Sequence, residues 1–140
     1  MIFEDRFHAA RLLADQLQQY KNNKDVVIIA IPRGALEIGY VLAQDLHVPL
    51  DVIFTKKIGA PGQPEFAIGA VSMEHIVIAP EYEHMPEIKK YSEQEAREIR
   101  KEIAKRTALY RQGMPPLNLK NKIVIVTDDG VATGRTLMLT

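Results

Sequence analysis

Two adjacent carboxylates, Asp128 and Asp129, follow an apolar run at residues 123–126, with Thr127 between them and the run. After them comes a loop of small residues, 130–136, which contains two glycines and two threonines. Ligands of open α/β sheets bind outside the carboxyl ends of the strands. The backbone N–H groups of such a loop suit a phosphate, whereas the carboxylates suit ribose hydroxyls or Mg²⁺. The segment therefore predicts a site for a phosphorylated sugar; the alternative is a strand that ends in a solvated acidic turn.

Three other phosphate-binding signatures do not fit this segment. A Walker A loop has four residues between its glycines and then Gly-Lys-Ser/Thr. Here three residues separate Gly130 from Gly134, and Arg135 stands where the lysine would be. The Gly-x-Gly-x-x-Gly fingerprint of dinucleotide-binding folds is absent from the sequence. The acids are adjacent, which also excludes the Asp-x-Asp of haloacid-dehalogenase-like enzymes.

The strand, the acidic pair and the Thr-Gly-x-Thr loop together resemble the phosphoribosyl pyrophosphate (PRPP) signature of type I phosphoribosyltransferases. Residues 30–35 (AIPRGA) and 56–71 (KKIGAPGQPEFAIGAV) are similar to a bacterial branch of that family, and so is the opening Phe3-x-Asp5-Arg6. The resemblance covers nearly the whole chain. It implies an α/β fold in which a mostly parallel central sheet is flanked by helices.

The resemblance also implies a function. We expect one domain, residues 1–140, that transfers the 5-phosphoribosyl group from PRPP to a nitrogenous base, releases pyrophosphate and depends on Mg²⁺. This transfer builds positive charge on the ribose and negative charge on the pyrophosphate, which acids and cations respectively would stabilise. Two alternatives stay open: a module that senses PRPP or a nucleotide without catalysis, and an inactive truncated member of the family.

The resemblance implies roles for the acidic pair and the loop after it. Asp128 and Asp129 would hold the ribose hydroxyls that also ligate Mg²⁺, so their contact with the metal would be indirect. Ala132 stands where family members that act on 6-oxopurines carry an Asp, which argues against hypoxanthine or guanine as the acceptor. The 5′-phosphate would be bound by Ala132, Thr133, Gly134, Arg135 and Thr136.

Cations for the pyrophosphate would come from two other blocks. Arg33 and Gly34 follow the first predicted strand and would meet the pyrophosphate with a backbone amide, at a turn that can include a strained peptide. Lys57, or Lys56 beside it, would reach the pyrophosphate from a mobile loop. The alternative for these lysines is an exposed basic pair. Glu65 is a candidate for holding the loop closed or for contacting the acceptor, and otherwise is a solvated side chain.

The rest of the sequence predicts the elements that position these residues. Apolar, β-branched runs at residues 26–31, 50–54 and 123–126 predict buried strands of a parallel sheet. Apolar residues at helical spacing predict helices over residues 3–20 and 34–46.

The segment between the second and third of these strands has a different pattern. Four Gly and Pro residues predict an irregular loop over residues 56–66, and a hairpin is expected over residues 67–79. Ser92 with Glu95 three residues later predicts a capping box. This would open a long, largely exposed helix over about residues 92–111, which could serve as a hood or an insertion.

Composition narrows the remaining classes. The 140 residues carry 18 basic and 18 acidic side chains and no cysteine, which excludes disulfides and thiolate zinc sites and makes nucleic acid an unexpected partner. The longest apolar run is far below the roughly 20 residues that span a bilayer, and the first residues do not resemble a signal peptide. We therefore expect a cytoplasmic protein without a membrane partner.

The position of the phosphate loop predicts an incomplete sheet. The helix that should carry the loop has no more than eight residues before the sequence ends at Thr140. The sheet is therefore expected to be C-terminally incomplete. Exposed Val124, Leu137 and Leu139 would favour a homo-oligomer, in which another chain completes the sheet edge.

Overall fold

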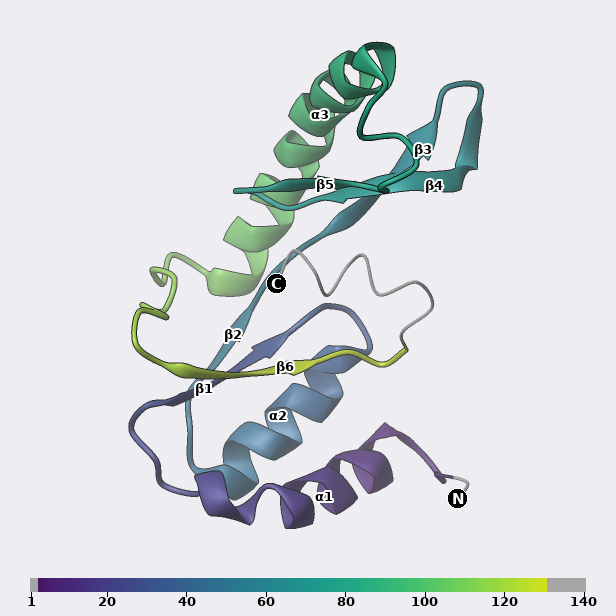
Figure 1. The fold of residues 1–140 in the computed structure, drawn as a ribbon. Helices are drawn as coiled ribbons and strands as arrows, with labels where there is room; N and C mark the ends of the chain where they lie inside the picture. The colour runs from purple at the N-terminus through teal and green to yellow at the C-terminus, as the bar shows by residue number, and fades with distance from the viewer. Residues whose placement is uncertain (1–2, 131–140) are drawn as a thin grey trace. The chain divides into compact units, whose positions relative to one another are not determined.

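The computed structural model describes residues 3–130, which form two compact units (Figure 1). The first unit combines residues 3–53 with 114–130, and the second consists of residues 54–113. The phosphate loop beyond residue 130, with Leu137 and Leu139, lies outside the described residues. That residues 1–140 form one domain stays a prediction.

A parallel three-stranded sheet forms the centre of the first unit. Its strands are β1 (Val26–Ala30), β2 (Leu50–Val52) and β6 (Ile123–Thr127), in the order β2-β1-β6. All five residues of β1 are buried, as expected for the central strand of a parallel sheet. The α/β class and the parallel central sheet are thus confirmed.

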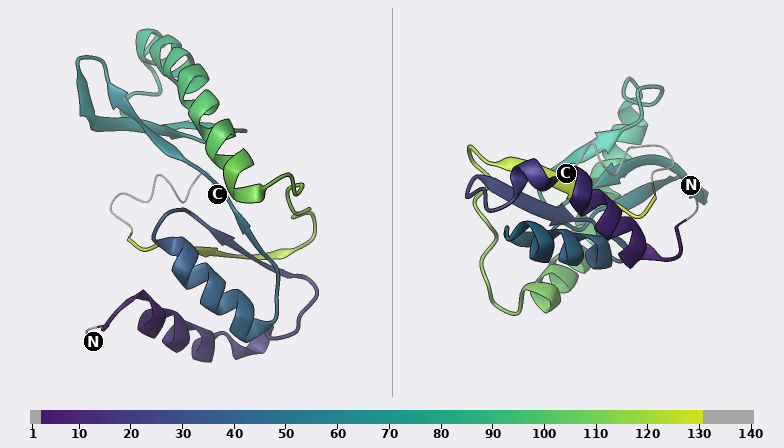
Figure 2. Two further views of the ribbon diagram at one scale, coloured as in Figure 1. Left: turned by 180° about the vertical axis from the view of Figure 1, so that it is seen from behind. Right: turned by 90° about the horizontal axis from the view of Figure 1, so that it is seen from below.

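Two helices cover this sheet. Helix α2 (Ala35–Leu46) packs on the strands, and α1 (Arg6–Gln16), which is followed by a short 3₁₀ turn η1 (Gln18–Tyr20), packs on α2 (Figure 2). The Asp5 carboxylate caps α1 by accepting a 2.6 Å hydrogen bond from the His8 N–H. The common core consists of Ala10, Ala14, Val26, Ile28, Ile38, Leu42, Ala43, Leu46 and Val48.

The apolar stripe of α1 is only partly buried, in contrast to the amphipathic pattern that predicted it. Ala10 and Ala14 are fully covered, but Phe3, Phe7 and Leu13 are 54%, 44% and 44% exposed. The small residues therefore make the close contact with α2, and the large ones remain accessible.

The second unit is an antiparallel sheet with one long helix. Strands β3 (Lys56–Ala60), β4 (Gln63–Val71) and β5 (Ile76–Ile78) pair in the order β3-β4-β5. The β4–β5 hairpin was expected. The irregular loop predicted over residues 56–66 is wrong, because this segment forms a second hairpin.

Glycines permit this unexpected hairpin. Gly62 has φ +75° at the turn, a conformation that L side chains rarely adopt. A side chain at Gly59 would collide with the backbone of Pro64, with its Cβ 2.6 Å from the Pro64 Cα. The pairing also shifts register on both sides of Gly59, as in a β-bulge. The Gly and Pro residues thus shape a strand pair instead of abolishing it.

Helix α3 (Pro86–Arg111) is longer than predicted. It begins at Pro86, a favoured residue for the first helical turn, and therefore six residues before Ser92. The predicted capping box at Ser92 is wrong: the Ser92 side chain is fully buried inside the helix, and its hydroxyl has no hydrogen-bond partner among the described residues. The helix buries a thin apolar stripe of Ala96, Ile99 and Ile103.

Strand β6 lies at the edge of its sheet within the described residues, since it pairs only with β1 there. Its exposed apolar side chains are Ile123 (44%) and Val126 (37%). Val124, which we expected to be exposed, is half-buried. Among the described residues, no helix is both long enough and apolar enough to cross a membrane.

The Gly59→Ala substitution should destabilise the protein. The new methyl group would meet Pro64 backbone that cannot rotate away, and such overpacking costs about 1–3 kcal/mol. Urea unfolding would measure the loss. Gly130→Ala is the matched control, because its Cβ would enter open space, and it should change the free energy of unfolding by less than about 0.5 kcal/mol. Equal effects of the two substitutions would contradict the close β3–β4 approach.

The Ser92→Ala substitution should stabilise the protein. It removes a buried hydroxyl without a partner, and burying such a group costs about 1–3 kcal/mol. The matched control is Ser72→Ala, which removes a buried hydroxyl that accepts a 3.1 Å hydrogen bond from the His75 N–H and should lower stability by about 1 kcal/mol. A loss of stability in Ser92→Ala comparable to that in Ser72→Ala would show that the Ser92 hydroxyl is satisfied.

Candidate functional site

The acidic pair lies at the carboxyl end of β6, beside the turn that follows β1. The two strands pair in parallel from Val26↔Ile123 to Ala30↔Thr127, and the Ile31 N–H extends the pairing with a 3.1 Å bond to the Thr127 carbonyl. The carboxyl ends of both strands therefore lie side by side, along the same edge of the sheet. This brings Arg33 and Gly34 to the edge that carries the acids.

Gly34 is in close contact with one of the acids. A Cβ added to Gly34 would overlap the carboxylate of Asp129 and would come within 2.9 Å of the Arg6 Nε atom. The peptide bond before Arg33, which joins it to Pro32, is cis. Residue 34 must therefore be glycine for the carboxylate to occupy its position.

Thr127 fixes the point at which β6 ends. Its buried hydroxyl lies 3.4 Å from the carbonyl oxygens of Ile29, in β1, and Ala35, at the start of α2. A hydrogen bond to either oxygen ties the end of β6 to the neighbouring elements. The next residue, Asp128, is half-buried, and its Oδ1 atom lies 3.5 Å from the Gly130 N–H as a weak acceptor.

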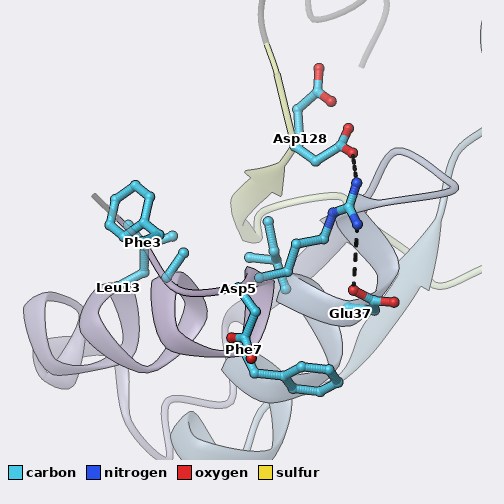
Figure 3. A pocket seen from close by; sticks show the side chains of 10 residues that line it. Phe3, Asp5, Phe7, Leu13, Glu37 and Asp128 are labelled. Atoms are coloured by element: carbon cyan, nitrogen blue, oxygen red, sulfur yellow. Dashed lines mark hydrogen bonds and ion pairs between the residues drawn. The ribbon is translucent and has the colours of Figure 1, made fainter. Parts of the chain in front are cut away.

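Arg6 is a site residue to which we assigned no role from the sequence. Its Nη2 atom donates to the Oδ2 atom of Asp129 at 2.8 Å, and its Nη1 atom lies 3.9 Å from the Oε2 atom of Glu37 (Figure 3). The hydrogen bond to Asp129 raises the pKa of the Arg6 guanidinium. The Phe3-x-Asp5-Arg6 block is the one sequence signal for this residue, but no spacing rule connects it to Asp129.

A pocket of about 780 Å³ opens between α1 and the acidic pair (Figure 3). Its apolar wall comes from α1, the residues before it and α2. Four carboxylates and one guanidinium form the polar part, so the pocket has a net negative charge. The lining residues are Phe3, Asp5, Arg6, Phe7, Ala9, Leu13, Glu37, Ile38, Asp128 and Asp129.

The acidic pair has the chemistry for Mg²⁺ only in combination with a ligand. Among residues 3–130, no group of three or more His, Asp or Glu side chains could hold a metal ion. In proteins, Mg²⁺ commonly takes one or two carboxylates, and waters and substrate phosphates complete its octahedron. Asp128 and Asp129 fit that arrangement, in which the metal arrives with its substrate.

The two predicted lysines belong to the second unit, on strand β3. Lys57 pairs with Glu65 across the β3–β4 hairpin, with Nζ 2.9 Å from Oε2, and this contact lowers the pKa of Glu65. Lys56 pairs with Glu102 on α3 at 2.6 Å and lowers the pKa of that carboxyl group. Glu102 on α3 thus bonds to a strand of the same unit.

The remaining predicted site residues follow Gly130. They are the phosphate-loop residues Ala132, Thr133, Gly134, Arg135 and Thr136, and all five lie outside the described residues. Of the predicted site residues, the described ones are therefore the acidic pair and the turn after β1 in the first unit, and the two β3 lysines in the second unit.

Comparisons with known proteins give one consistent result. The profile of the phosphoribosyl transferase domain family matches residues 3–140. Two curated proteins from Mycobacterium tuberculosis strains are each 33% identical over 137 residues: "Putative phosphoribosyl transferase MT0597" (strain CDC 1551 / Oshkosh) and "Putative phosphoribosyl transferase Rv0571c" (strain H37Rv). The match covers 96% of this chain and 31% of those proteins, so the chain spans about a third of their length.

A solved structure agrees with the fold. The crystal structure of TT1426 from Thermus thermophilus matches with a TM-score of 0.77 and 37% sequence identity, over 99% of this chain and 66% of TT1426. Fold, sequence profile and relatives therefore confirm the resemblance that the motifs indicated: this chain belongs to the phosphoribosyl transferase family.

Proposed function

We propose that this chain binds PRPP at the carboxyl ends of β1 and β6 and transfers its 5-phosphoribosyl group to a nitrogenous base, with release of pyrophosphate. The observation that supports this most directly is the contact between Gly34 and the Asp129 carboxylate. It joins the two segments that would hold opposite ends of the reacting bond. The ribose would lie over the acids, and the pyrophosphate would lie at the turn after β1.

The acids suit the sugar end of this bond. When the bond between the anomeric carbon and the pyrophosphate oxygen breaks, its electron pair leaves with the pyrophosphate and the sugar becomes oxocarbenium-like. Asp128 and Asp129 would accept hydrogen bonds from the ribose 2′- and 3′-hydroxyls, and their negative charge would favour the cationic sugar. The base nitrogen would then form the new bond to the anomeric carbon.

Cations are needed at the other end of the bond. The exposed Arg33 side chain and the Gly34 N–H would meet the departing pyrophosphate, as would Lys57 or Lys56 and, at the 5′-phosphate, residues 132–136. Bound Mg²⁺ would neutralise pyrophosphate charge and orient the substrate. Lys57 pairs with Glu65. Pyrophosphate would therefore have to displace the Glu65 carboxylate in order to bind this lysine.

The acceptor base stays open within this proposal. Ala132 disfavours a 6-oxopurine, and the chain spans 66% of TT1426 and 31% of the curated relatives, which have further sequence that could contribute to base recognition. A cytoplasmic location and a homo-oligomer stay predictions. The sensor alternative shares the same PRPP site and differs only in the absence of transfer.

Calorimetry should show that PRPP binds only when Mg²⁺ is present and that Asp128→Asn/Asp129→Asn abolishes this binding. Each lost charged hydrogen bond is worth about 1.5–3 kcal/mol, so the double variant should bind roughly a hundredfold more weakly or worse. Asp45→Asn, on the exposed side of α2, is the matched control and should bind as the wild type does. Unchanged binding in the double variant would remove the acidic pair from the site.

Pyrophosphate release should separate the enzyme from the sensor. PRPP, Mg²⁺ and one of a panel of bases, including adenine, uracil and hypoxanthine, would be incubated with the protein. We expect release with at least one base and none without a base, and we expect the release to disappear in the double Asp variant. Tight PRPP binding without release for any base would contradict the transferase proposal and favour the sensor.

A further inference from the structure

The Arg6 side chain connects three elements at the acidic pair. It extends from the first turn of α1, bonds Asp129 at the end of β6 and lies 3.9 Å from Glu37 on α2. Its Nε atom also lies close to Gly34. The side chain is half-exposed, as is the Asp129 carboxylate at 36%, so the pair lies at the surface of the pocket and not in the core.

The Asp129 carboxylate is restrained from two sides. Gly34 packs against it with no room for a Cβ, and the Arg6 guanidinium holds its Oδ2 atom at 2.8 Å. Among the described residues, the Oδ1 atom accepts no hydrogen bond. Within residues 3–130, one oxygen is therefore engaged by Arg6 and the other accepts no hydrogen bond.

Arg6 is itself held in place by the start of its helix. Asp5, the preceding residue, caps α1 through the 2.6 Å hydrogen bond from the His8 N–H, and this fixes the backbone from which Arg6 extends. Half-exposed ion pairs contribute little to stability, so stability alone gives little reason for such an arrangement. A fixed carboxylate beside a ligand pocket does have a use, because it loses less conformational freedom when the ligand binds.

We infer that Arg6 is a positioning residue for PRPP: it orients the Asp129 carboxylate so that its Oδ1 atom meets a ribose hydroxyl. This inference rests on the proposed function. Arg6 does not contact the reacting atoms in this role and acts through Asp129. Its planar guanidinium matters as well as its charge, because its fork can meet Asp129 and Glu37 together, which the single ammonium of lysine cannot do in the same geometry.

The test is PRPP affinity, measured by calorimetry at saturating Mg²⁺, in wild type, Arg6→Met and Arg6→Lys. Immobilising one side chain corresponds to a change in Kd of about three- to tenfold, and we expect Arg6→Met to weaken binding by that factor. Arg6→Lys should recover only part of the loss. Arg11→Met removes an exposed arginine from the same helix and, as the matched control, should stay within about twofold of wild type.

A double-mutant cycle tests whether Arg6 acts through Asp129. In an Asp129→Asn background, Arg6→Met should weaken binding by less than about twofold, because the carboxylate that it orients is already gone. Melting temperatures of all variants should remain close to that of wild type, which separates this role from a structural one.

Several outcomes would overturn the inference. Arg6→Met that binds like Arg11→Met would show that the side chain is not needed. Full recovery in Arg6→Lys would show that positive charge alone suffices. Equal losses from Arg6→Met in the wild-type and Asp129→Asn backgrounds would show that it acts independently of Asp129. Wild-type protein that binds no PRPP would instead contradict the proposed function, and with it any role of Arg6 in PRPP binding.

Discussion

The parallel pairing of β1 with β6 is the constraint on which the site depends. These strands are far apart in the sequence, yet they pair over five consecutive residues and end together at Ala30 and Thr127. A slip of one residue would turn every side chain of β6 to the opposite face of the sheet. The buried Thr127 hydroxyl, which bonds toward β1 and α2, opposes such a slip. The register therefore determines that the acids meet the turn after β1.

Around this register, the surrounding residues adapt to a carboxylate at the edge of the sheet. Gly34 leaves the space that the Asp129 carboxylate fills, and Arg6 supplies the opposite charge. Neither residue gains much stability from its position, since the contacts are half-exposed. The positions of Gly34 and Arg6 are better explained by the ligand-binding role that we propose for the Asp129 carboxylate. The N-terminal helix thus contributes to the site as well as to the core.

Much of this arrangement could be predicted from local sequence patterns. The β-branched runs identified β1 and β6, and the acids with their small-residue loop identified the sheet edge at which we propose that the ligand binds. The hairpin over residues 56–66 could not be predicted, because its glycines read as loop residues until the close approach of Gly59 to Pro64 is known. The start of α3 was misplaced for a related reason: Ser92 has the sequence pattern of a cap, but tertiary packing buries it inside the helix. Arg6 was missed as a site residue because only the folded chain brings it to Asp129.

The net charge of the whole chain does not indicate the local charge at this site. The overall charge is zero, but the pocket beside the acidic pair combines four carboxylates with one guanidinium, and α3 carries eight Lys and Arg residues against five Glu. A pyrophosphate ester is strongly anionic and would be repelled by the acids alone. In the proposed function, its binding at this edge therefore requires more positive charge than Arg6 and Arg33 supply, and Mg²⁺ would provide it. Such a requirement would itself be selective, because an anion that brings no hydroxyls for the acids and no metal has fewer favourable contacts to offset the repulsion. Under the proposed function, this separation of charge within a neutral chain would favour PRPP over simpler phosphates.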